Sequence, residues 1–191
     1  MKCTILLFLV IGSLVPAFCQ RLDLNANVKL TPVATAAFSL NEWRQNKASV
    51  VIFFSPDCPI CIGFTKSIRE LADSFSGRGI KFYLIFPGDF SAAQIRKFQK
   101  QYTIPIPAYR DERKQLVKIL AATTTPQAFV INPEGEIIYS GKIDNRYENI
   151  GKQRTVITQF YLRDALNAAL NHYEPSIKKT EPVGCFINIK P

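Results

Sequence analysis

The chain has 191 residues, an apolar share of 47% and a formal net charge of +9. This length favours one domain with short extensions, and the apolar share excludes a disordered chain because it is high enough for a packed core. The basic residues are scattered among acidic ones and form no long run. We therefore interpret the charge mainly as a contribution to solubility and expect no nucleic-acid partner.

The N-terminus has the pattern of a secretory signal peptide. An apolar run of 11 residues, Ile5 to Val15, is shorter than the about 20 that span a bilayer. The small-x-small pattern that follows predicts cleavage near Gln20, and hence export to the periplasm or the extracellular space. Lipid anchoring at Cys19 is the less favoured alternative, because the preceding Phe18 is large.

The rest of the chain alternates strand and helix patterns. The first half of the chain predicts a short helical turn at 38–43, a buried strand at 49–54, a helix that follows Cys61 and ends at Gly77 and Gly79, and a strand at 80–86. A helix at 91–102 with Ser91 as N-cap, an extended segment at 104–109 and a helix at 112–120 are expected next. Strands at 127–131 and 136–140, joined by a hairpin turn, precede a last helix that begins near Thr155. This order predicts an α/β fold with a central mixed β-sheet flanked by helices on both faces. We divide the chain into a signal peptide (1–19), one domain (20–175) and a C-terminal tail (176–191).

The strongest chemical signal is Cys58-Pro59-Ile60-Cys61, between the first long strand and its helix. This spacing places both sulfurs in the first helical turn, close enough for a disulfide. The helix N-terminus favours a thiolate at Cys58, and Pro59 is tolerated because the first turn needs no N–H from it. A thiolate there can attack a substrate disulfide, and Cys61 can resolve the mixed disulfide.

Other uses of the motif are less favoured. A purely structural disulfide rarely closes so small a loop. A zinc site needs further ligands, and the one histidine, His172, is expected at the exposed end of the last helix. A haem site needs a histidine after Cys61, where Ile62 stands. We expect neither a metal nor a cofactor.

Thr125-Pro126 directly precedes a predicted strand, which makes this bond a candidate cis peptide. The backbone of Thr125 would then be free to pair with an extended peptide.

Together, Ser55 to Cys61 after a buried strand and the later Thr125-Pro126 resemble the thioredoxin superfamily. The resemblance covers about 34–172 and is closest to the redoxin group, which includes alkyl hydroperoxide reductase/thiol-specific antioxidant proteins. The segments 139–146 and 183–187 are similar to those of exported bacterial redoxin-domain proteins. The resemblance implies a thioredoxin-like fold, a Cys58 nucleophile, a Cys61 resolving thiol, and a cis Pro126 beside them.

Three positions depart from the family patterns. Ile52 stands where thioredoxins have a buried aspartate, so proton transfer from Cys61 must rely on another group or on water. Asp57 stands where they usually have tryptophan, and its carboxylate opposes a neighbouring thiolate. Val51 stands where a peroxiredoxin has proline, although Ser55 fits that pattern.

The tail carries a third cysteine, Cys185, followed by Phe186 and Ile187. After signal cleavage the cysteines number three, so one thiol is left over when the other two pair. Cys185 is either a third redox thiol that exchanges with the active pair or a buried free thiol under a docked tail. Residues 141–154 are either a wall of the substrate groove, through Asp144 to Tyr147, or a solvated loop.

We therefore predict an exported thiol-disulfide oxidoreductase that acts on protein thiols and disulfides. Its reducing equivalents would have to cross a membrane, which makes a membrane electron relay a further partner. The alternatives are a thiol peroxidase with Cys58 as peroxidatic thiol and a non-catalytic thioredoxin-fold binding or assembly module.

Overall fold

The computed structural model describes residues 21–34 and 37–189. The predicted signal peptide at 1–19, the cleavage point at Gln20 and the lipid alternative at Cys19 lie outside these residues. Within the described part of the chain, no helix is both long and apolar enough to cross a membrane.

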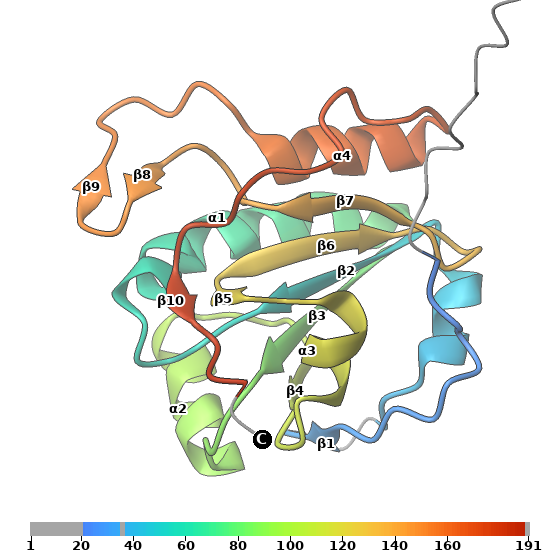
Figure 1. Ribbon diagram of the computed structural model, residues 1–191, viewed down its shortest axis with the longest axis horizontal. Helices are drawn as coiled ribbons and strands as arrows, with labels where there is room; N and C mark the ends of the chain where they lie inside the picture. The colour runs from blue at the N-terminus through green and yellow to red at the C-terminus, as the bar shows by residue number, and fades with distance from the viewer. Residues whose placement is uncertain (1–20, 35–36, 190–191) are drawn as a thin grey trace, which may run out of the picture.

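A mixed six-stranded sheet passes through the centre of the molecule (Figure 1), in the order β1-β4-β3-β2-β6-β7. Its strands are β1 (Thr31–Pro32), β2 (Ala48–Phe53), β3 (Ile80–Phe86), β4 (Ala108–Arg110), β6 (Gln127–Ile131) and β7 (Ile137–Gly141). The inner strand β2 runs parallel to β3 and antiparallel to β6. Every residue of β2 is buried, as expected for a strand covered on both faces.

Helical segments cover both faces of this sheet. They are η1 (Leu40–Gln45), α1 (Pro59–Phe75), η2 (Ser76–Arg78), α2 (Ala92–Gln101), α3 (Gln115–Leu120) and α4 (Tyr161–Leu170). Val50 and Ile52 share one apolar cluster with residues of α1, α2 and α4, whereas Val51 shares the other with residues of η1 and α3. This alternation along β2 builds two cores, so the predicted α/β fold is confirmed.

Two predicted helices begin later than expected. The predicted helix at 112–120 begins at Gln115, because Asp111 accepts hydrogen bonds from the backbone N–H groups of Gln115 (2.7 Å) and Val117 (3.0 Å). The last helix begins at Tyr161 rather than near Thr155. The reason is that the side-chain oxygen of Asn145 accepts the N–H groups of residues 158 and 159, which holds them outside the helix.

The predicted extended segment at 104–109 forms a strand only from residue 108 onward, as β4. Its strand part, β4, lies between β3 and the short β1 and so has a neighbour on each side. Two further pairs of short strands lie outside this sheet: β8 (Tyr147–Asn149) with β9 (Lys152–Gln153), and β5 (Thr124–Thr125) with β10 (Cys185–Phe186).

Candidate active site

The two cysteines of the motif lie at the junction of β2 and α1, as the sequence predicts. Cys58 is the N-cap of α1 and Pro59 is its first residue, so the missing N–H of the proline costs no helical hydrogen bond. The side chain of Cys58 is 2% exposed and that of Cys61 is fully buried, whereas Pro59 is exposed. Of the two sulfurs, Cys58 is therefore the one nearer to the surface.

The structure joins Cys58 to Cys185, not to Cys61. The Cα atoms of the disulfide-bonded pair are 6.2 Å apart, and 127 residues separate them along the chain. Cys61 is the free thiol among the described residues. The disulfide that the motif spacing favours is thus absent from this structure, and Cys185 is not the free thiol that one interpretation of the tail required.

The bond between Thr125 and Pro126 is cis, as expected for this position. The carbonyl oxygen of Thr125 lies 3.2 Å from the sulfur of Cys58. In the disulfide this sulfur carries no proton, so the approach is a van der Waals contact. After reduction, the Cys58 thiol can donate a hydrogen bond to the same carbonyl.

Cys61 lies beneath the disulfide in an apolar environment. Burial raises the pKa of the Cys61 thiol to about 12, partly offset by hydrogen bonds from the backbone of Ser55 and the side chain of Thr125. The N–H of Ser55 lies 3.4 Å from its sulfur. Ile52, in the thioredoxin aspartate position, is fully buried and supplies no carboxylate. Cys61 is therefore a protected thiol that ionises only weakly at neutral pH.

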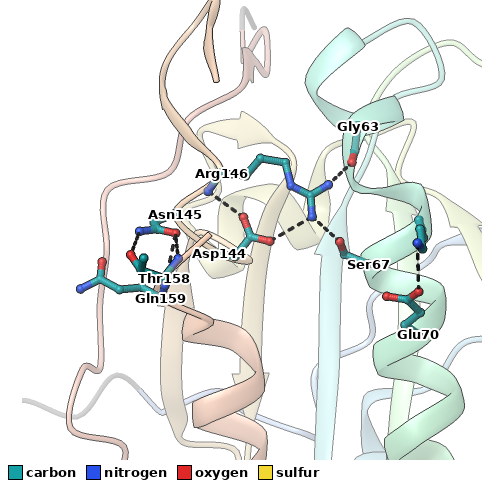
Figure 2. A network of polar contacts seen from close by, with 9 residues as sticks. Gly63, Ser67, Glu70, Asp144, Asn145, Arg146, Thr158 and Gln159 are labelled. Atoms are coloured by element: carbon teal, nitrogen blue, oxygen red, sulfur yellow. Dashed lines mark hydrogen bonds and ion pairs between the residues drawn. The ribbon is translucent and has the colours of Figure 1, made fainter. Parts of the chain in front are cut away.

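The segment 144–147 braces α1 (Figure 2), a role that the sequence does not predict. The guanidinium of Arg146 donates hydrogen bonds to the carbonyl of Gly63 and, at 2.6 Å, to the hydroxyl of Ser67. It also forms an ion pair with buried Asp144, with an N–O distance of 3.3 Å. No local pattern reveals this brace, because the α1 partners lie 83 and 79 residues away.

The predicted groove wall at 144–147 is only partly matched by this arrangement. Asp144 and Asn145 are buried rather than solvated. The side chain of Asn145 binds residues 158 and 159. A cavity of about 430 Å³ beside Arg146 is lined by residues of α1, α4 and their connections, and neither Cys58 nor Cys61 lines it. Asp144 and Arg146 therefore brace α1, while Asp144 and Tyr147 also line a smaller cavity beside Pro126.

In the part of the chain that the structure describes, no three His, Cys, Asp or Glu side chains form a group that could hold a metal ion. His172 is exposed just beyond α4.

Comparison with known families matches residues 12–140 to the AhpC/TSA family, which is more than half of the 191 residues. No curated protein is similar enough to count as a match.

Solved structures share the fold at low sequence identity. A hypothetical protein from Sinorhizobium meliloti 1021 is 23% identical with a TM-score of 0.77, and the alignment covers 88% of this chain and 92% of that one. An uncharacterized conserved protein from Geobacillus kaustophilus has the same identity and coverage and a TM-score of 0.79. A secreted disulfide oxidoreductase of Mycobacterium tuberculosis, homologous to E. coli DsbE, is 16% identical with a TM-score of 0.52, over 75% of this chain and 93% of that one. The fold is therefore thioredoxin-like.

Proposed function

The chain belongs to the AhpC/TSA family, and we propose that it is an exported thiol-disulfide oxidoreductase that acts on protein thiols and disulfides. One observation carries the proposal: Cys58 is disulfide-bonded to a cysteine on an extended strand beside Pro126, while Cys61 stays a free thiol underneath. This is the bonding pattern of a mixed disulfide between the first cysteine of a redox motif and a substrate, before the second cysteine has reacted.

The reaction proposed for substrate reduction has two exchange steps. The Cys58 thiolate attacks one sulfur of a substrate disulfide, so that a Cys58–substrate disulfide forms and one substrate thiolate leaves. Cys61 then loses its proton and attacks the Cys58 sulfur, which forms the Cys58–Cys61 disulfide and releases the second substrate thiolate. Two electrons pass from the protein to the substrate, and the reverse sequence oxidises a substrate dithiol.

The surrounding residues are proposed to hold the substrate chain. The backbone of Thr125 is positioned to pair with an extended peptide, and Pro126 keeps that backbone turned toward Cys58. Exposed Pro59 lies directly after Cys58 and offers an apolar surface at the rim of the site.

The decisive experiment equilibrates the mature protein with dithiothreitol or glutathione redox buffers and then quantifies its free thiols after acid quenching. We expect a reversible two-electron couple in the wild type that Cys58→Ser abolishes and that Cys185→Ser retains, because Cys61 can then pair with Cys58. A potential near −270 mV would indicate a reductant and one near −120 mV an oxidant. Absence of any couple would refute the proposal and favour a binding module.

A thiol peroxidase remains the principal alternative reaction. Val51 is fully buried in β2 where a peroxiredoxin has proline, and the described contacts of Ser55 with the two cysteines run from its backbone rather than from its hydroxyl. Neither observation favours peroxide chemistry. Consumption of hydrogen peroxide that depends on Cys58 would nevertheless replace the proposed function by this one.

Export is proposed from the N-terminal pattern and is compatible with the secreted nature of the Mycobacterium tuberculosis structure described above. An exported reductase would draw electrons from a membrane relay. N-terminal sequencing of the protein recovered outside the cytoplasm should begin at Gln20. A chain that starts at Met1 would contradict export by cleavage.

A further inference from the structure

The C-terminal tail follows the molecule along two sheet edges in turn. It first pairs with β7, where the N–H of Ser140 donates to the carbonyl of Lys178 and the N–H of Thr180 donates to the carbonyl of Ser140, each at 3.0 Å. It then crosses to β5, and Figure 1 shows β10 lying alongside β5. The first contact anchors the tail, and the second places it at the active site.

The second contact is an antiparallel pairing in a defined register. Cys185 lies opposite Thr125 and Phe186 lies opposite Thr124. The N–H of Ile187 continues the pairing by donating to the carbonyl of Thr123 at 2.8 Å. The tail thus occupies the same backbone edge that is proposed to hold a substrate.

Side chains at 185–187 alternate between the protein and the solvent, as in any β-strand. Val183 lies in a small cavity together with Phe64, Pro126 and Tyr147. Cys185 reaches Cys58, and Ile187 is 8% exposed in the second core cluster. Phe186 points away and is 83% exposed.

Gly184 is required by the close approach of the two backbones. A Cβ atom at this position would lie 2.2 Å from the carbonyl oxygen of Thr125, which is main chain and cannot rotate away. In this register the edge formed by Thr125 therefore accepts only glycine directly before the cysteine. A residue with a side chain at that position would force the two backbones apart.

From this register we infer that residues 183–187 are a tethered substrate strand that occupies the peptide-binding edge, and that the free edge selects extended peptides of the same pattern. The pattern is an aliphatic residue, glycine, cysteine, any residue, and an aliphatic residue. This inference rests on the proposed function and adds to it the class of substrate. Because the strand is covalently tethered, its high effective concentration disfavours outside peptides until it leaves.

Release of the strand needs only an internal thiol-disulfide exchange. Cys61 gives up its proton to solvent and its thiolate attacks the Cys58 sulfur. The Cys58–Cys185 bond breaks, the Cys58–Cys61 bond forms, and the Cys185 thiolate leaves and takes up a proton. No oxidant or reductant is consumed. The burial of Cys61 limits its thiolate fraction, which keeps the occupied form long-lived.

The first test maps the disulfides of the oxidised mature protein by acid quenching and mass spectrometry. Gly184→Ala should raise the ratio of Cys58–Cys61 to Cys58–Cys185 at least fivefold over the wild type, because the added Cβ displaces the strand. The matched control is Phe186→Ala, two positions away on the exposed face, which should change the ratio less than twofold. Equal ratios in Gly184→Ala and wild type would overturn the inference.

The second test uses the full-length Gly184→Ala/Cys185→Ser variant, in which the edge is open. Its substrate is the peptide Val-Gly-Cys-Phe-Ile-Asn carried as a glutathione mixed disulfide. We expect exchange at least tenfold faster than with peptides that have leucine in place of the glycine or aspartate in place of the isoleucine. A peptide with alanine in place of the phenylalanine should react like the parent.

Failure of the tethered-substrate inference and failure of the oxidoreductase function give different results. If all four peptides react equally while glutathione disulfide still exchanges with Cys58, the tethered-substrate inference is wrong and the oxidoreductase function stands. If neither the peptides nor glutathione disulfide exchange, the function on which the inference rests is wrong as well.

Discussion

At the scale of single residues, the two cysteines of the motif differ in environment as much as in position. Cys58 caps α1 and contacts both the carbonyl of Thr125 and the tail. Cys61 is enclosed, and the raised pKa of its thiol has burial as its main cause. Cys58, the less enclosed of the two, is thus suited to the first exchange step proposed above, and Cys61 to a slower second step.

This difference predicts a strong pH dependence of the second step. In Cys185→Ser protein that carries glutathione on Cys58, release of glutathione requires the Cys61 thiolate. Because the pKa of Cys61 is about 12, the release rate should rise about tenfold per pH unit from pH 7 to pH 10. The rate is measured by stopped-flow or quenched chromatography.

Cys61→Ser in the same background is the control and should release no glutathione at any pH. A rate that levels off near pH 8 would contradict the prediction, since it would mean that Cys61 ionises in the ordinary range for a thiol.

At the scale of elements, α1 is held from outside by a loop that is distant in sequence. Arg146 donates to α1 at two places and pairs with Asp144, and its guanidinium lies 4.9 Å from the centre of the Phe64 ring. Burial raises the pKa of Asp144, and the neighbouring Arg146 opposes this shift. The loop therefore stabilises the helix on which both cysteines depend.

Removing Arg146 should destabilise the fold more at neutral than at acid pH. Arg146→Ala leaves the Asp144 carboxylate buried without its cation, at a cost of about 3 kcal/mol in the free energy of unfolding at pH 7. The pKa of Asp144 rises further in the variant. Its folded state then binds the proton more tightly than the unfolded state, so stability falls as pH rises from about 3.9 through the folded pKa.

Chemical denaturation at pH 4 and at pH 7 measures this difference. Arg154→Ala is the matched control, because Arg154 pairs with Glu148 at the surface and its side chain is 45% exposed. That variant should lose less than about 1 kcal/mol at either pH. A loss for Arg146→Ala as small as that of the control would contradict the bracing role.

At the scale of the whole molecule, one covalent bond connects the start of α1 to the end of the chain. It closes a loop of 127 residues in sequence separation. The tail otherwise depends on short strand pairings at β7 and β5 and on the burial of Ile187. The Cys58–Cys185 disulfide therefore adds a covalent attachment of the tail to these non-covalent ones.

The oxidised wild type should accordingly be more stable than Cys185→Ser by about 3–5 kcal/mol, since a loop of this length restricts the unfolded chain strongly. The Cys58–Cys61 bond that remains available in the variant closes a much shorter loop and compensates only in part. Urea denaturation under non-reducing conditions measures the difference, and an excess of reductant should remove most of it. Equal stability without reductant would contradict the pairing of Cys58 with Cys185.

The fold class, most elements and the place of Cys58 and Cys61 could be predicted from the sequence. These features depend on local patterns: the apolar run of β2, the helical spacing in α1, the Ser91 cap of α2, and proline before β6. Each is written into a few consecutive residues, because backbone hydrogen bonding and the burial of one face act over one or two turns or a single strand.

Which cysteines are joined, and what surrounds them, became visible in the folded chain alone. The spacing of Cys58 and Cys61 favours their pairing, yet the antiparallel register of β10 on β5 brings Cys185 to Cys58 instead. The brace from Arg146 to α1 is equally distant in sequence. Such contacts depend on where the folded sheet places its edges and loops, and no periodicity in a single segment encodes that meeting of remote residues.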